Sequence, residues 1–257
     1  MTTFRAWITM LILLASYNFV FITNVSAAEN PTTVPKQEWS FSGIFGNFDD
    51  ASNQRGLQVY LEVCANCHGL EYVAYRNLSE IGYNDEQIKA IAAQFEVEDG
   101  PDNEGNMFTR SARPSDYFVN PYANEKEAAY MNNGAIPPDL SLLFKARPGG
   151  ADYIYAVLTG YQDSHEQNIP EGLYFNTYFA GGAIAMPQPL YGDDVEYQDG
   201  TDASLEQEAK DVTAFLAWAA EPNLETRKEL GLKAILFLIA LTALLYASKR
   251  KIWNDVH

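Results

Sequence analysis

Apolar residues recur with helical spacing in two stretches of the chain, and each stretch predicts one amphipathic helix. The first helix is predicted to begin with Asp50 or Ser52 as its N-cap. Its apolar face, at positions i, i+3, i+4 and i+7, consists of Leu57, Tyr60, Leu61 and Cys64. The second is predicted to begin at a capping box over residues 204–207 and to end before Pro222. Its apolar stripe consists of Ala209, Val212, Phe215, Leu216 and Ala219.

Turn-forming residues dominate the long segment between these two helices. Gly and Pro recur there in pairs, for example at 100–101, 137–138, 149–150 and 181–182, while strand-like alternation is sparse. The pattern predicts a mostly α-helical domain with long loop segments. Because such loops bury little apolar surface, we expect a large bound cofactor to help organise them.

The C-terminal stretch 230–248 is apolar except for Lys233, which lies one turn inside it. At about 1.5 Å per residue its length approaches the roughly 30 Å of bilayer hydrocarbon, so it is predicted to be a transmembrane helix. The basic cluster 249–251 and Trp253 follow directly, which places the tail 249–257 in the cytoplasm and the domain outside. A buried core helix is the alternative for this segment.

The N-terminus has the features of an export signal. Arg5 precedes an apolar run that begins at Ile8, and the small residues that follow allow cleavage after Ala27 or Ala28. Residues 1–28 are therefore predicted to be a signal peptide and 29–229 an exported periplasmic domain, the alternative being an uncleaved anchor. One base and no Arg/Ser-rich amphipathic pattern favour a bacterial inner membrane over a mitochondrion.

The charge is strongly acidic and lies almost wholly in the predicted exported domain. The chain has 34 acidic and 17 basic residues, a net charge of −17, and residues 29–229 alone carry 33 acids and 12 bases, a net of −21. Binding to phosphate backbones needs the opposite sign, so nucleic acid is excluded as a partner.

The only two cysteines form the motif Cys64-Ala65-Asn66-Cys67-His68. C-x-x-C-H is the attachment signature of c-type haem: two thiols one turn apart reach the vinyl groups and the histidine meets the iron. A thioredoxin-like redox pair would need a surrounding βαβ pattern, and zinc would need a fourth ligand. We therefore predict one covalently attached haem c, with His68 as one iron ligand.

The second iron ligand decides between electron transfer and ligand chemistry. Candidates within the predicted exported domain are Met107, Met131, Met186 and His165. Met186 is favoured because Pro187 and Pro189 limit the backbone around its thioether, although methionine is also a common core residue. A His/Met pair would raise the reduction potential and favour electron transfer.

From about Trp39 to Lys251 the chain resembles cytochrome c1, the haem subunit of the cytochrome bc1 complex. The resemblance rests on an ordered series of motifs: the haem motif 64–68, GAIPPDLS at 134–141, ARPGGADY at 146–153, EGLYFN at 171–176, AMP at 185–187, and FLAWAAEP at 215–222. It implies a mostly α, cytochrome-c-like haem domain with long loops and one C-terminal transmembrane helix.

The resemblance also implies roles for particular residues. Met186 becomes the sixth iron ligand, and Pro137 and Pro138 pack near the haem. Arg147 and Tyr153 are suited to the propionates, since a guanidinium fork and a phenol can both bind carboxylate. Asn132 is expected to hydrogen-bond in the pocket. Both cysteines are committed to haem, so the disulfide of some relatives is absent.

The function that the resemblance implies is electron transfer within a bilayer-embedded quinol:cytochrome c oxidoreductase. Its partners would be cytochrome b, the Rieske iron–sulfur protein as donor, and a basic or membrane-bound c-type cytochrome as acceptor. Two acidic runs, 96–104 and 193–202, are either solvated surface or the surface that steers a basic acceptor. A haem peroxidase and an independent membrane-tethered electron shuttle are the other function classes.

Overall fold

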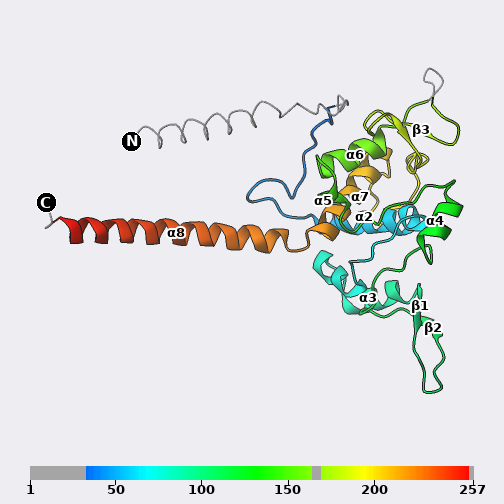
Figure 1. The fold of residues 1–257 in the computed structure, drawn as a ribbon, viewed down its shortest axis with the longest axis horizontal. Helices are drawn as coiled ribbons and strands as arrows, with labels where there is room; N and C mark the ends of the chain where they lie inside the picture. Colours follow the sequence, from blue (N-terminus) through cyan, green and yellow to red (C-terminus); the bar gives the residue numbers. More distant parts are fainter. Residues whose placement is uncertain (1–32, 164–168, 255–257) are drawn as a thin grey trace, which may run out of the picture. The chain divides into compact units, whose positions relative to one another are not determined.

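The computed structural model describes residues 33–163 and 169–254. Helices predominate among the described residues: α2 (Asp50–Glu62), α3 (Asp85–Ala92), α4 (Glu125–Met131), α5 (Leu143–Ala146), α6 (Ala151–Thr159), α7 (Leu205–Ala220) and α8 (Leu224–Trp253) (Figure 1). Two 3-10 helices, Cys64–Asn66 and Tyr75–Ile81, follow α2. The mostly α fold with long loops is thus confirmed. The predicted signal peptide and His165 lie outside the described residues.

The strands of the described domain are short and form two antiparallel pairs. β1 (Glu96–Asp99) pairs with β2 (Phe108–Ser111), and β3 (Tyr174–Phe175) pairs with β4 (Ala183–Ile184). β1 lies within the acidic run 96–104 and β2 follows that run, where the sequence shows little strand-like alternation. Each pair joins the two sides of a long loop and so limits its freedom.

Both predicted amphipathic helices are present, with small differences at their starts. The N-cap of α2 is Asp49, whose carboxylate accepts a hydrogen bond from the Ala51 amide at 3.2 Å, so the prediction of Asp50 or Ser52 was wrong. Asp49 has extended backbone, as an N-cap requires, whereas Asp50 is already helical. Ser204 caps α7 by accepting from the Gln207 amide at 3.3 Å.

The core of the domain lies between α2 and α7, where the two helices approach closely. A Cβ added to Gly56 would lie only 2.1 Å from the Asp211 carbonyl oxygen, so only glycine allows this contact. Tyr60 of α2 packs on Phe215 of α7, with ring centroids 5.8 Å apart, and both are buried. This packing fixes the C-terminal end of α2, from which the haem motif continues.

A buried ion pair between α2 and α7 also holds these two helices together. Arg55 of α2 donates to the Asp211 carboxylate through Nε at 2.8 Å and Nη2 at 3.2 Å. Ser52 and Gln207 donate to the same carboxylate at 2.6 and 2.9 Å. Every charge-bearing oxygen of this buried carboxylate therefore has a donor, as burial demands.

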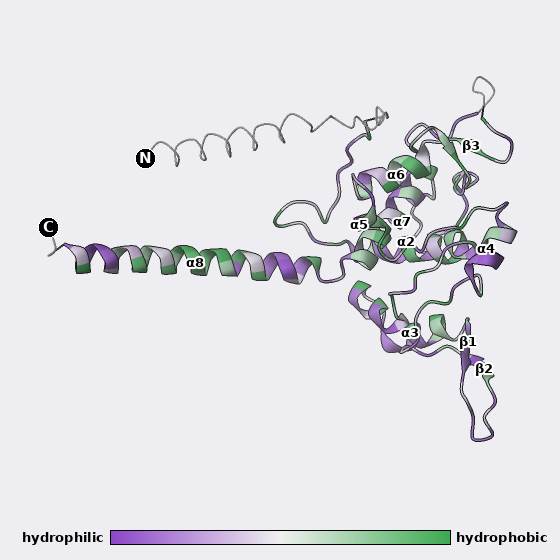
Figure 2. Cartoon of the chain, in the orientation of Figure 1, coloured by the Kyte–Doolittle hydropathy of each residue, from purple (hydrophilic) through white to green (hydrophobic). Residues whose placement is uncertain are grey.

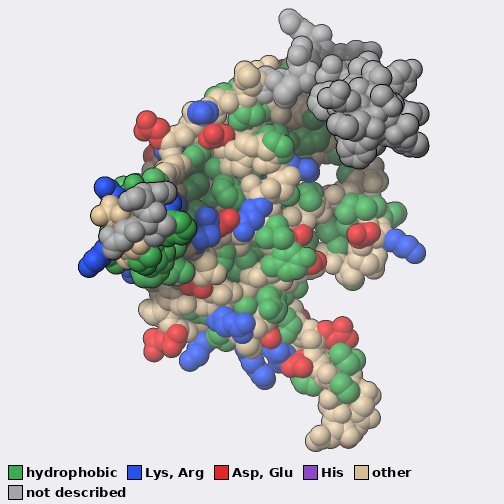
Figure 3. Space-filling view, turned by 60° about the vertical axis from the view of Figure 1, so that its left-hand side comes forward, with side chains coloured by type: hydrophobic (Ala, Val, Ile, Leu, Met, Phe, Trp, Pro, Cys, Tyr) green, Lys and Arg blue, Asp and Glu red, His purple; other side chains and the backbone are tan. Residues whose placement is uncertain are grey.

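The long helix α8 carries the predicted membrane-spanning stretch. It begins at Leu224, six residues before the predicted span, and its most apolar window has a mean hydropathy of 2.2 with none of its residues buried. Hydrophobic residues predominate in its middle and polar residues towards its ends (Figure 2). In the space-filling view, where the helix points toward the viewer, hydrophobic and basic side chains are visible on it (Figure 3). The helix is therefore long and apolar enough to cross a bilayer.

Candidate haem-binding site

The predicted site residues meet around one cavity of about 300 Å³. They reach it from the haem motif, the loop before α5, the start of α6 and the segment after β4. The predicted residues that line it are Cys67, His68, Asn132, Pro138, Arg147, Tyr153 and Met186. Cys64 packs against the edge of the hydrophobic core next to this wall. The motifs that are far apart in the sequence thus converge on a single pocket.

The haem motif forms a tight turn at the end of α2. The amides of Cys67 and His68 both donate to the Cys64 carbonyl, at 3.1 and 2.9 Å, and close a 3-10 turn. Burial raises the pKa of the Cys64 thiol to about 12, and the neighbouring Cys67 adds to the shift. The predicted apolar face had included Cys64, but α2 ends at Glu62 and the turn carries both cysteines.

The His68 ring is held in one orientation by a backbone carbonyl. Its Nδ1 lies 2.7 Å from the Pro138 carbonyl oxygen, which can only accept, so Nδ1 carries the proton and Nε2 keeps its lone pair. Burial lowers the pKa of His68, although the Pro138 carbonyl acts in the opposite direction. A neutral imidazole with a fixed tautomer and a free Nε2 is the form that ligates iron.

The residue after His68 is a glycine in close contact with two polar side chains. A Cβ on Gly69 would lie 2.0 Å from Oδ1 of Asn120 and 3.1 Å from Oδ2 of Asp139. The carbonyl of Gly69 also accepts from the Leu140 amide at 2.9 Å, which brings the Pro138 segment alongside the haem motif. This close approach is what places the Pro138 carbonyl against His68.

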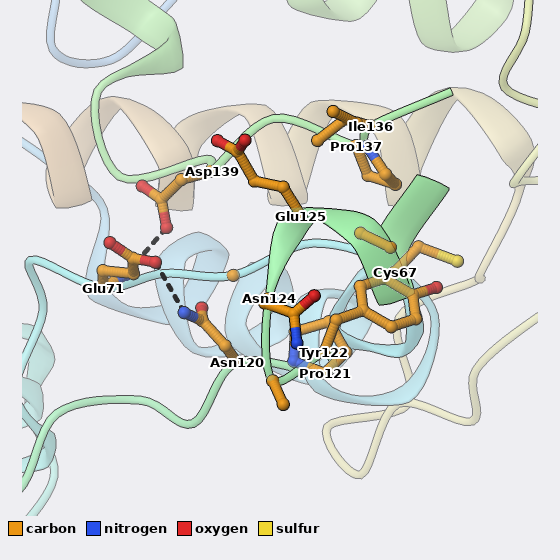
Figure 4. A pocket seen from close by; sticks show the side chains of 13 residues that line it. Cys67, Glu71, Asn120, Pro121, Tyr122, Asn124, Glu125, Ile136, Pro137 and Asp139 are labelled. Atoms are coloured by element: carbon orange, nitrogen blue, oxygen red, sulfur yellow. Dashed lines mark hydrogen bonds between the residues drawn. The ribbon is translucent and has the colours of Figure 1, made fainter. Parts of the chain in front are cut away.

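A second, polar pocket of about 200 Å³ adjoins the cavity and shares Cys67 and Pro137 with it. Asp139 accepts a hydrogen bond there from the Glu71 amide at 2.8 Å (Figure 4). It also accepts from the Ser141 amide at 2.9 Å. The Asn120 side chain donates to the Glu71 carboxylate at 2.5 Å in the same view. These hydrogen bonds hold together the loops that pack beside His68. The sequence alone gave no indication of this role.

Asn132 lines the cavity, but its side-chain NH₂ group bonds to residues of the neighbouring loop and helix. Its Nδ2 donates to the Ala128 carbonyl at 2.7 Å and to the Tyr122 hydroxyl at 3.0 Å. Asn132 is also the C-cap of α4. Only Oδ1 remains for a hydrogen bond into the cavity, so its main contacts fix the loop that leads to Pro137.

Met186 lies on the cavity wall two residues beyond β4. Its carbonyl accepts from the Tyr161 hydroxyl at 3.0 Å, and Ile184 before it is buried. The other methionines of the domain, Met107 and Met131, are 56% and 64% exposed, and neither is among the described residues that line this cavity.

Buried Asn176 organises the loop that carries Met186. Its Nδ2 donates to the Val157 carbonyl of α6 at 2.7 Å. Its Oδ1 accepts from the amides of Tyr178 and Phe179, at 3.0 and 3.2 Å. One fully buried amide thus ties this loop to a helix. Its place in the EGLYFN motif was the only sequence signal for it.

Arg147 and Tyr153 flank a turn made of two glycines with positive φ, Gly149 at 93° and Gly150 at 53°. Only glycine adopts such angles readily, and the turn starts α6. Arg147 is exposed and Tyr153 half-buried, and both line the cavity. A cation and a phenol are therefore available to carboxylates at the cavity.

The residues around this cavity fit a c-type haem. Its walls include apolar side chains such as Val157 and Ile184, and it presents an imidazole nitrogen and a thioether. Nitrogen and thioether donors suit haem iron. Across residues 33–163 and 169–254, three or more His, Cys, Asp or Glu side chains nowhere gather as a metal site.

Comparison with known proteins identifies relatives that cover most of the chain. The cytochrome c1 family matches residues 39–256. Cytochrome c1 of Rhodospirillum rubrum is 51% identical over 247 residues, which cover 90% of this chain and 91% of the relative. The mitochondrial cytochrome c1 haem protein of Saccharomyces cerevisiae is 48% identical, covering 90% of this chain and 76% of the relative. The Candida albicans relative named cytochrome b-c1 complex catalytic subunit is 47% identical, covering 90% and 81%. The chain therefore belongs to the cytochrome c1 family.

Proposed function

We propose that this chain is the haem c electron-transfer subunit of a quinol:cytochrome c oxidoreductase, the cytochrome bc1 complex. One observation carries the proposal: the cavity holds a histidine whose Nδ1 is bound by the Pro138 carbonyl, and Met186 lies on the wall of that same cavity. The name of the Candida albicans relative supports membership in a bc1 complex.

The residues divide the task of holding one haem. Cys64 and Cys67 would hold the haem through thioether links, and His68 Nε2 and the Met186 thioether would ligate its iron. Arg147 and Tyr153 would bind its propionates. When bound, the haem supplies a one-electron redox centre.

The chain's own groups tune that centre toward electron transfer. The Pro138 carbonyl keeps His68 oriented and makes it a better donor. The Met186 backbone is held by the Tyr161 hydroxyl, and its thioether would occupy the second ligand position of the iron and so keep oxygen and peroxide from it. A peroxidase would need that position open.

The proposed membrane topology divides the chain into four segments. Residues 1–28 are a signal peptide, 29–229 the periplasmic haem domain, 230–248 the membrane anchor and 249–257 the cytoplasmic tail of a bacterial inner-membrane protein. In this arrangement the domain takes electrons from the Rieske iron–sulfur protein, beside cytochrome b, and passes them to a c-type cytochrome.

The acidic runs are the proposed docking surfaces for a basic acceptor, but not all of their carboxylates are free. Asp99 pairs with Arg110, and Asp199 pairs with Arg55. Reversal of the exposed Glu96, Glu98 and Glu104 to Lys tests the first run without breaking an ion pair. We expect the salt dependence of acceptor reduction to weaken. An unchanged salt dependence would exclude this run, and reversal of Asp193 and Asp202 makes the same test of the second.

The axial ligation is tested with reduced-minus-oxidised spectra of the purified full-length protein. The native protein should show a low-spin c-type α-band, be reduced by ascorbate and not bind carbon monoxide. Met186→Leu should bind carbon monoxide and lose ready reduction, because its iron would lack the sixth ligand. Met107→Leu and Met131→Leu are matched controls that should behave as the native protein. Carbon monoxide binding by the native protein would refute the proposal.

Membership in a complex needs its own measurement, since an independent membrane-tethered shuttle could share the same ligands. Gentle detergent extraction followed by purification of this chain should bring b-type haems with it. If the c-type haem purifies alone under conditions that keep cytochrome b folded, the shuttle becomes the better assignment.

A further inference from the structure

A short loop between Phe41 and Phe48 exposes two large hydrophobic side chains at its tip. Ile44 is 68% exposed and Phe45 is 80% exposed. The flanking Phe41 and Phe48 belong to a hydrophobic cluster together with Trp39 and Leu224 of α8. Solvent-exposed apolar residues on such a firmly seated loop indicate a contact that lies outside the domain itself.

The loop is closed by its own backbone. The Ser42 amide donates to the Trp39 carbonyl at 3.0 Å, and the Asn47 amide donates to the Ser40 carbonyl at 3.1 Å. A Cβ on Gly46 would lie 2.0 Å from the Ser42 carbonyl oxygen, so the two sides of the loop touch. Ile44 and Phe45 are thus presented on a tight, pre-formed tip.

The first turns of α8 hold the same loop. Lys228 Nζ donates to the carbonyls of Phe41 and Gly46, at 2.6 and 2.9 Å, and therefore fastens both sides of the loop. The Glu225 carboxylate accepts from the Phe48 amide at 2.7 Å. These bonds fix the loop to the helix that carries the proposed membrane span.

The loop is attached to α8 close to the residue at which the apolar stretch of this helix begins. Lys228 precedes Leu230 by two residues, which is about 3 Å along a helix axis. The loop is therefore anchored within one helical turn of the predicted hydrocarbon boundary.

The chemistry of the loop also suits lipid. The segment 39–48 contains no charged residue, although residues 29–229 carry a net charge of −21. Aromatic and aliphatic side chains without charge are favoured at the boundary between headgroups and acyl chains. An acidic domain can approach a lipid surface with its anionic headgroups only through such a segment.

We propose that Ile44 and Phe45 insert into the bilayer surface beside α8, so that the haem domain contacts the membrane at two points. The inference rests on the proposal that α8 spans the bilayer. A second contact would restrict tilting of the domain about the start of α8, and would hold the haem site at a defined orientation to the membrane.

The test uses the full-length haem-loaded protein in lipid nanodiscs with a nitroxide label on Phe45→Cys. Cys64 and Cys67 are blocked as thioethers, so labelling is specific. Collision with oxygen, which partitions into lipid, is compared with collision with a water-soluble nickel chelate. Leu236→Cys in α8 is the lipid reference and Tyr130→Cys in α4 is the water reference, since both side chains are exposed, at 59% and 86%.

We expect the Phe45 label to collide preferentially with oxygen, as the Leu236 label does, and an Ile44→Cys label to agree. Nickel accessibility equal to that of the Tyr130 label would overturn the inference while leaving the anchor intact. Protection from both reagents would also overturn it, in favour of a protein partner. If the Leu236 label is itself accessible to nickel, the proposed span fails and the inference with it.

Discussion

Replacement of Asp211 by Ala tests whether the ion pair between α2 and α7 supports the haem motif. The carboxylate is 1% exposed and accepts from Arg55, Ser52 and Gln207. Its removal leaves the Arg55 guanidinium, which is only 16% exposed, without its principal partner.

The magnitude follows from the burial of the pair. Breaking a buried ion pair by removing one partner costs about 3–5 kcal/mol. Arg55 keeps a second contact, to Asp199 at 2.8 Å, so the lower end of this range applies. We therefore expect Asp211→Ala to lower the free energy of unfolding by about 3 kcal/mol.

The matched control uses the other carboxylate on the same arginine. Asp199 is 45% exposed, and an exposed ion pair contributes about 0–1 kcal/mol. Denaturant unfolding of the haem-loaded protein, followed by circular dichroism and by haem absorbance, measures both variants. The reasoning is refuted if Asp199→Ala costs as much as Asp211→Ala, or if Asp211→Ala costs less than about 1 kcal/mol.

Three further predictions concern pH dependence, the turn after His68 and the Met186 loop. Burial raises the pKa of Glu208 from 4.5 to about 7, so the stability that its bound proton provides is complete below about pH 4.5 and is lost as pH rises through 7. Between pH 5 and 8 the free energy of unfolding of the wild type should therefore fall by about 2 kcal/mol relative to that of Glu208→Gln, which has no titrating group at this position. Thermal unfolding across this range measures both proteins, and an equal pH dependence of the two would contradict the prediction. Gly69→Ala should disturb the haem spectrum because its Cβ would lie 2.0 Å from Asn120 Oδ1. Adding Asn120→Ala to the same chain removes this contact and should restore the spectrum. Failure to restore it would contradict the assignment of the effect to this contact. Asn176→Ala should cost about 3 kcal/mol and allow carbon monoxide to bind, because one buried and two half-buried backbone groups lose their partner. An unchanged spectrum would show that this amide does not position Met186.

The features that the sequence predicted well are those with a strong local signal. Helical periodicity located α2 and α7, and an apolar stretch with one lysine located the candidate span within α8. The spacing of Cys64, Cys67 and His68 predicted the haem motif, and the cytochrome c1 family to which the chain belongs agrees with a c-type haem. Met186 was favoured over Met107 and Met131 by its prolines, and the structure places it alone of the three on the cavity wall.

The features that the sequence analysis missed depend on contacts between distant segments. The Pro138 carbonyl that orients His68 is a backbone atom 70 residues away, and no side-chain pattern encodes it. Asp139 and Asn176 act on backbone amides, so their sequence neighbours carry no sign of the role. Asn132 lines the cavity, and its Nδ2 donates to Ala128 and Tyr122 while its Oδ1 remains for the expected hydrogen bond in the pocket. The β1–β2 pair was missed because each strand has four residues and only one apolar side chain, which is too short a pattern to show alternation.

The two halves of the site are held by different forces, and this has a functional consequence. The half with Cys67 and His68 continues from α2, which packs along α7 through buried aromatic rings and the Asp211 ion pair. The half with Met186 follows the short β3–β4 pair, and its loop is held by the hydrogen bonds of Tyr161 and Asn176. Loops of this kind open at lower free energy than packed helices. We therefore expect the cavity wall with Met186 to open before the wall with His68. If Met186 is the second iron ligand, as proposed, the loop from Asn176 to Met186 controls the access of external ligands to the iron.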